Sequence, residues 1–244
     1  MLNTKALSQK YSFIYCGSHE TASINHLRLF AQTRRYPSAV LLIVQLLGLL
    51  LYPFAESTRF GGHALAFFGL VVLFVTVRMV RGTPWLTWIS VGLAMPTTVL
   101  LVLQAFTDRP HLVIWSSALE AVFYFYAAGS LIAYMLADRK ATLDELFAIG
   151  ATFTLLAWAF THLFMVVQTL QPSCFLAAVN AQQNRSWSEL MYLNFALLSS
   201  TGIGDVIPIT VHARAVASVA MFAGVMYLAM VVSRLIGLTL QPRQ

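Results

Sequence analysis

Long apolar blocks separated by short polar connectors dominate the chain. A helix needs roughly 20 apolar residues to cross the hydrocarbon core of a bilayer. Six blocks approach or exceed that length, and each predicts a membrane-spanning helix. They cover residues 38–54, 63–80, 84–106, 111–136, 145–167 and 213–238. Residues 1–37 are polar and mildly basic, with room for one amphipathic helix near 24–32.

The pattern changes after the fifth block. Residues 168–185 are mixed and polar, and residues 187–199 are apolar but too short to cross a membrane. A loop that contains glycines follows at 200–208, before the last block. Irregular backbone at membrane depth is tolerated only where it lines a cavity or is buried in protein. The pattern therefore predicts a re-entrant short helix and loop that enter the membrane and return to the same side.

Composition supports a membrane protein and argues against other classes. Hydrophobic residues make up 59% of the chain and charged residues 10%, whereas a soluble domain carries about 25% charged residues. The net charge is +6, but the basic residues flank apolar blocks, so no nucleic-acid partner is expected. The sequence shows no histidine pair at ligand spacing, no phosphate-binding loop and no nucleophile–base pair. We therefore expect neither an enzyme nor a cofactor.

The basic residues also predict an orientation. If the N-terminus is cytoplasmic and the chain crosses six times, four of the fifteen lysines and arginines lie outside and eleven inside. The four outside are Arg59, Arg109, Arg185 and Arg214. Because cytoplasmic connectors are enriched in lysine and arginine, this bias favours six spans, both termini in the cytoplasm and a re-entrant loop that enters from outside.

The loop after the short helix has the residue pattern of an ion path. A cation that leaves water needs its hydration oxygens replaced, and a ring of backbone carbonyls can do this. Gly202 and Gly204 are spaced by two, and glycine takes positive φ without steric penalty, so alternate residues can turn successive carbonyls to one side. Ser200, Thr201 and Ile203 add further carbonyls.

Residues 186–238, a little over a fifth of the chain, resemble the pore of the potassium-channel family. Residues 191–208 are similar to its pore helix and selectivity filter, and residues 212–215 and 227–238 to the inner helix of bacterial members. Ser186 and Glu189 form a capping-box pattern that opens the short helix. The negative end of that helix dipole would then face a cation.

The resemblance implies roles for individual residues. It makes Ser200, Thr201, Gly202, Ile203 and Gly204 the potassium-binding filter. It also makes Asp205 and Tyr192 a hydrogen-bonded support at the outer end of the filter. The sequence departs from the family pattern at three positions: Ile203 replaces an aromatic residue, Ser200 replaces threonine, and Thr201 replaces valine or isoleucine. Because isoleucine braces the filter by packing alone, a less selective monovalent cation channel is the alternative within this class.

Gly224 lies twenty residues beyond Gly204, where the family often has a hinge in its inner helix. Close helix packing explains a glycine in a membrane helix equally well. Arg234, near the end of the same block, is expected to extend to lipid headgroups.

Two ionisable residues lie within apolar blocks. Glu120 is a candidate functional acid, because acids inside membrane spans are costly and are usually retained for function. The alternative is a structural pair with Arg78, Arg81 or Gln104. His162, in the fifth block, is expected to be a packed, hydrogen-bonded histidine rather than a pH sensor.

Voltage sensing needs several arginines along the fourth span, and residues 111–136 contain none. The first four blocks resemble a voltage-sensor scaffold only in number.

These observations predict an all-α membrane protein with six transmembrane helices, a re-entrant pore helix and a selectivity-filter loop. We expect a cytoplasmic segment at 1–37, a four-helix peripheral domain and linker at 38–144, and a pore domain at 145–244. The predicted function is passive potassium conduction, not steeply voltage-gated, through a homotetramer in the plasma membrane. The partners are then the lipid bilayer and permeant potassium ions. A secondary transporter is the alternative from another class, although transporters usually carry paired broken helices and only one interrupted element is visible here.

Overall fold

The computed structural model describes residues 36–56, 61–80, 84–106, 110–137, 142–181 and 183–239. The chain divides into two compact units, Met1–Pro37 and Ser38–Gln244. The helix expected near 24–32 and nearly all of the predicted N-terminal segment lie outside the described residues.

Helices occupy all six blocks for which the hydrophobic pattern predicts them, so their type and place are confirmed. They are α2 (Pro37–Glu56), α3 (Gly61–Val80), α4 (Pro84–Phe106), α5 (Pro110–Ala137), α6 (Leu143–Leu170) and α8 (Val211–Thr239). The predicted short helix is α7 (Trp187–Leu198). Two strands of three residues, β1 (Phe175–Ala177) and β2 (Val206–Pro208), are the departure from an all-helical chain.

Three helical stretches of the described residues are long and apolar enough to cross a membrane: His111–Ala137, Leu143–Leu170 and Val211–Gly237. The apolar stretches of α2, α3 and α4 are shorter, at Pro37–Tyr52, Gly69–Arg78 and Trp88–Leu103. The protein is therefore a helical membrane protein, and the six-span topology stays a prediction.

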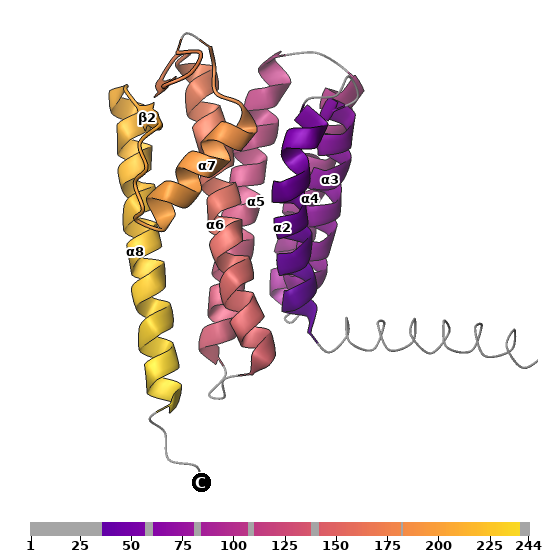
Figure 1. Cartoon of the computed structure of the whole chain (residues 1–244). Coiled ribbons are helices and arrows are strands. Elements are labelled where there is room, and N and C mark those ends of the chain that lie inside the picture. Colours follow the sequence, from indigo (N-terminus) through magenta and orange to yellow (C-terminus); the bar gives the residue numbers. More distant parts are fainter. Residues whose placement is uncertain are drawn as a thin grey trace, which may run out of the picture. The chain divides into compact units, whose positions relative to one another are not determined.

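α6 is the central helix of the second unit. It packs against α5, α7 and α8, and α3 and α4 pack against α5. Figure 1 shows α7 lying obliquely across α6 and α8. Of the most apolar stretch of α6, 67% is buried, but the corresponding value for α8 is only 28%. The described residues thus leave most of the apolar stretch of α8 uncovered.

The N-terminal end of α6 is tied to two distant parts of the chain. Thr142 is its N-cap, and Thr142 and Glu145 form a capping box. Asp144 accepts hydrogen bonds from the backbone N–H of Ser38 at 3.0 Å and from its hydroxyl at 2.8 Å. Glu145 also pairs with Arg234 of α8 at 3.0 Å. Arg234 therefore contacts a buried carboxylate within the protein, a partner that the sequence did not predict, and its reach to lipid headgroups stays a prediction.

The short strands join the segment after α6 to the segment after α7. They are antiparallel, with Phe175 opposite Pro208 and Ala177 opposite Val206. The backbone N–H of Ala178 donates to the carbonyl of Asp205 at 3.1 Å and extends the pairing by one residue. Cys174, just before β1, is buried, and burial raises the pKa of its thiol, so the thiol stays protonated near neutral pH.

Candidate functional site

The loop between α7 and β2 has an alternating backbone. Ser200, Gly202 and Gly204 have φ values of +59°, +59° and +79°, while Thr201 and Ile203 between them do not take positive φ. The positive φ expected at the two glycines is confirmed. The sequence reasoning missed Ser200, where a non-glycine residue adopts the left-handed region at a cost of about 1–2 kcal/mol. Such alternation of the backbone is what the predicted filter requires, because it allows successive carbonyls to face one side of the loop.

α7 holds the beginning of this loop. Its N-cap is Ser186, and the capping box with Glu189 that the sequence predicts is present. At the other end, the carbonyl of Ala196 accepts hydrogen bonds from the backbone N–H groups of Thr201, at 2.9 Å, and of Gly202, at 3.1 Å. The loop therefore starts directly on the C-terminal end of α7, where the helix dipole favours positive charge.

Some side chains of the loop form hydrogen bonds, and others are exposed to the surroundings of the single chain. The hydroxyls of Ser199 and Thr201 lie 2.6 Å apart, and Ser199 also donates to the carbonyl of Phe195 at 2.6 Å. Ile203 is 59% exposed in the single chain. Loop residues 199–205 are all exposed, so the rest of the described chain does not cover this segment.

Asp205 and Tyr192 do not meet as the family resemblance implies. Asp205 accepts a hydrogen bond from the backbone N–H of Val206 at 2.9 Å. Tyr192 is 41% exposed, and no hydrogen bond joins these two residues, both of which the structure describes. Their role as a filter support stays a prediction.

A buried side-chain amide on α7 forms a hydrogen bond to α6. The side-chain N–H of Asn194 donates to the hydroxyl of Thr161 on α6 at 2.9 Å, and Thr161 donates onward to the carbonyl of Ala157 at 2.7 Å. Asn194 and Thr161 are fully buried. A polar contact buried in this way fixes one arrangement of the two helices, because breaking it leaves unpaired groups in an apolar interior.

Gly224 lies where α8 meets the end of α7. A Cβ atom added there would stand 2.2 Å from the carbonyl oxygen of Leu198 and 2.6 Å from its Cα. These are backbone atoms, which cannot rotate aside. The structure thus supplies a packing reason for the glycine, and the hinge role stays a prediction.

Glu120 and His162 form a pair that the sequence reasoning did not predict. The carboxylate oxygen Oε2 of Glu120 on α5 lies 3.1 Å from Nδ1 of His162 on α6, with both side chains under 10% exposed. Nδ1 of His162 makes no aligned hydrogen bond, so the two side chains are in close polar contact without a well-directed hydrogen bond between them. Two isolated ionisable groups in adjacent apolar spans are natural partners, and this is the signal in the sequence that indicates the pair.

None of the partners expected for Glu120 is seen to contact it among the described residues. Arg78 is exposed on α3, whereas Arg81 and the side chain of Gln104 lie outside the described residues. Around His162, the ring of Tyr124 stacks at a centroid distance of 5.6 Å, and the ring of Trp187, the first residue of α7, lies at 6.3 Å. The pair is therefore next to the N-terminal end of the short helix.

Comparison with known proteins gives one match. Residues 121–241, just under half of the chain, match the model of a family described as ion channel. No curated protein and no solved structure matches the chain. The matched residues run from within α5 to the end of α8 and include α7 and the whole loop 199–205. The chain therefore carries an ion-channel domain, which supports an ion-channel family for this membrane protein.

Proposed function

We propose that this protein is a homotetrameric potassium channel whose ion path is lined by the backbone of Ser200, Thr201, Gly202, Ile203 and Gly204. The observation that carries the proposal is the alternating left-handed backbone at Ser200, Gly202 and Gly204, in an exposed loop at the C-terminal end of a short helix. Backbone carbonyls that replace the hydration shell are how potassium filters work. The ion-channel match over the same residues supports it.

The same geometry supports the proposed homotetramer. One loop supplies one line of carbonyls, and a potassium filter uses four such loops around an axis. The poorly covered surface of α8 offers room for neighbouring subunits as well as lipid, because Phe222, Val225 and Met226 are all exposed in the single chain. Ile203 in the loop and Tyr192 on α7 are also exposed in the single chain and would be covered in the same assembly.

The membrane arrangement belongs to the proposal as well. We place the protein in the plasma membrane, with both termini cytoplasmic and the loop entered from outside. α5 contains no lysine or arginine, so the pore is not steeply voltage-gated. The family match indicates an ion channel rather than an enzyme, and nothing in it favours the secondary transporter.

A less selective monovalent cation channel is the second candidate, and Ile203 is the observation that favours it. Its side chain has no hydroxyl with which to hold the filter from behind, and it is 59% exposed in the single chain. The two candidates share a fold and a pore, so a measurement of ion preference separates them.

The test is ion flux through the purified protein in liposomes, with potassium and sodium compared directly. A potassium channel releases trapped potassium much faster than trapped sodium, and a cation channel releases both at similar rates. Gly202→Ala is the matched variant: a side chain at positive φ costs about 1 kcal/mol or more in each subunit, although open space surrounds that position. We expect Gly202→Ala to reach the membrane and to lose potassium flux. Normal flux in that variant, or none in the wild type, would overturn the proposal.

A further inference from the structure

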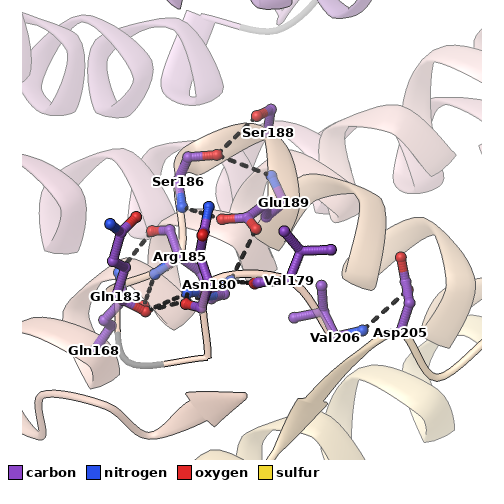
Figure 2. A network of polar contacts seen from close by, with 10 residues as sticks. All are labelled: Gln168, Val179, Asn180, Gln183, Arg185, Ser186, Ser188, Glu189, Asp205 and Val206. Atoms are coloured by element: carbon purple, nitrogen blue, oxygen red, sulfur yellow. Dashed lines mark hydrogen bonds and ion pairs between the residues drawn. The ribbon is translucent and has the colours of Figure 1, made fainter. Parts of the chain in front are cut away.

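The segment between α6 and α7 contains a buried arginine that the proposed ion path does not use. Arg185 lies directly before the N-cap of α7 and is 3% exposed. The side-chain amide of Gln168, near the end of α6, binds both backbone groups of Arg185. Its oxygen accepts from the N–H, and its nitrogen donates to the carbonyl, both at 2.8 Å. Figure 2 shows this clamp together with the groups around the guanidinium.

The guanidinium of Arg185 collects the carbonyls of a turn. Its Nε donates to the carbonyl of Gln183 at 3.1 Å and one Nη to that of Val179 at 3.1 Å. The other Nη donates to the carbonyls of Asn180 and Gln183. Asn180 has a φ of +53°, a conformation that asparagine tolerates better than most residues. Three carbonyls of one turn therefore converge on a single planar cation.

The guanidinium of Arg185 also contacts α7. The Nη that binds Val179 also lies 3.0 Å from Oε1 of Glu189. The other carboxylate oxygen of Glu189 accepts the backbone N–H of Ser186 at 2.8 Å and closes the capping box. Burying an arginine is costly unless its charge and its N–H groups are paired. Here carboxylate and carbonyl oxygens do both, so the cation and the fold of the turn depend on each other.

The turn is connected to the outer end of the loop at 199–205. It follows β1 directly, and β1 pairs with β2, which begins at the residue after Asp205. Ala178, the residue before Val179, donates its N–H to the carbonyl of Asp205 at 3.1 Å. Figure 2 places Asp205 and Val206 beside the Arg185 network. A shift of the turn therefore moves the backbone that holds Asp205.

We propose that Arg185 is a positioning residue for the outer end of the ion path. It joins the start of α7 to the turn behind Asp205 and so fixes both ends of the segment that carries the loop. This inference rests on the proposed potassium-channel function. Arginine is required because its planar fork presents donors in several directions at once, whereas lysine has a single ammonium group at the end of a flexible chain.

The experiment uses the full-length protein in planar bilayers and compares Arg185→Gln and Arg185→Lys with wild type. Ion preference comes from reversal potentials in mixed sodium and potassium, and filter stability from the decay of current at low external potassium. We expect both Arg185 variants to lose current at least about tenfold faster than wild type. That fold-change corresponds to about 1.4 kcal/mol, the scale of one hydrogen bond to a charged group. The decay should slow again at high external potassium, which a general loss of stability would not produce.

Two further variants keep the result interpretable. Arg214→Gln is the matched control: Arg214 is exposed near the same end and donates to the carbonyl of Pro208 at 3.1 Å, so its loss removes a positive charge but leaves the turn intact. Glu189→Gln removes one arm of the guanidinium contact and serves if Arg185→Gln does not assemble; we expect a smaller shift in the same direction.

The outcomes separate this inference from the proposed function. Absence of potassium current in the wild type would overturn both. A conducting wild type together with Arg185→Gln or Glu189→Gln variants that assemble and keep normal decay and ion preference would overturn this inference alone. Wild-type behaviour of Arg185→Lys, or an equal effect of Arg214→Gln, would show that only the charge matters and would likewise overturn it.

Discussion

Gly224→Ala tests whether the contact between α8 and the end of α7 is as close as the structure describes. The added Cβ would stand 2.2 Å from the carbonyl oxygen of Leu198. Even a weak C–H···O contact keeps carbon and oxygen about 3.3–3.6 Å apart. The two helices must therefore separate by roughly 1 Å, because the obstructing atoms are backbone. Leu198 is the last residue of α7, so the loop that begins after it moves as well.

The expected cost is about 1–3 kcal/mol per subunit, the usual range for overpacking an interior. It opposes the gain of about 1 kcal/mol that alanine normally brings over glycine within a helix. The free energy of unfolding, measured by denaturant titration in detergent, should therefore fall, and ion flux should fall with it. Gly237→Ala is the control, because Gly237 lies on the same helix and a Cβ there meets nothing within 4 Å. That variant should be as stable as wild type or slightly more stable.

A Gly224→Ala variant with wild-type stability and wild-type flux would refute the close contact. Wild-type stability with an altered open probability would instead favour the hinge role over packing. Comparison with Gly237→Ala separates an effect of the contact at Gly224 from the general effect of replacing a helical glycine by alanine.

Three further predictions follow from other parts of the chain. Because α5 contains no lysine or arginine, the conductance–voltage relation should be shallow; a slope as steep as that of voltage-gated channels would contradict this. Glu120→Gln or His162→Gln alone should destabilise the protein by about 1–3 kcal/mol, because each removes the neighbour of a buried polar group. Apolar replacement of both should recover much of that loss in the same denaturation assay, and additive single effects would argue against the pair. Ile203→Tyr should still conduct and, if an aromatic brace stabilises the loop, should show slower decay of current; faster decay would count against that reasoning.

The helices could be predicted from the sequence because their signal is local. The length of each apolar block can be read directly from the sequence. The capping-box residues Ser186 and Glu189 indicate where α7 begins, and they lie within four residues of each other. The positive φ of Gly202 and Gly204 follows from the special freedom of glycine, which the sequence displays directly. Ser200 carries no such mark, since its φ is imposed by contacts such as the hydrogen bond from its N–H to the carbonyl of Leu197 at 3.1 Å.

The contacts between distant segments could not be predicted because they depend on packing. Glu120 and His162 stand on different helices, and nothing local chooses between His162 and the arginines as partner. Strands of three residues such as β1 and β2 have no alternation long enough to detect, and they exist because they pair with each other. In the sequence, Arg185 is an ordinary basic residue of a polar connector. Only the structure shows that its guanidinium binds the carbonyls of the turn.

The most direct test of the central claim is an experimental structure of the protein determined in potassium. We predict four copies around one axis, with residues 200–204 facing that axis and potassium density stacked beside Thr201, Gly202 and Ile203. Replacement of potassium by sodium should weaken or rearrange that density while α7 and α8 keep their contact. A structure in which residues 200–205 lie away from any symmetry axis, or in which the axis passes through another part of the chain, would contradict the account.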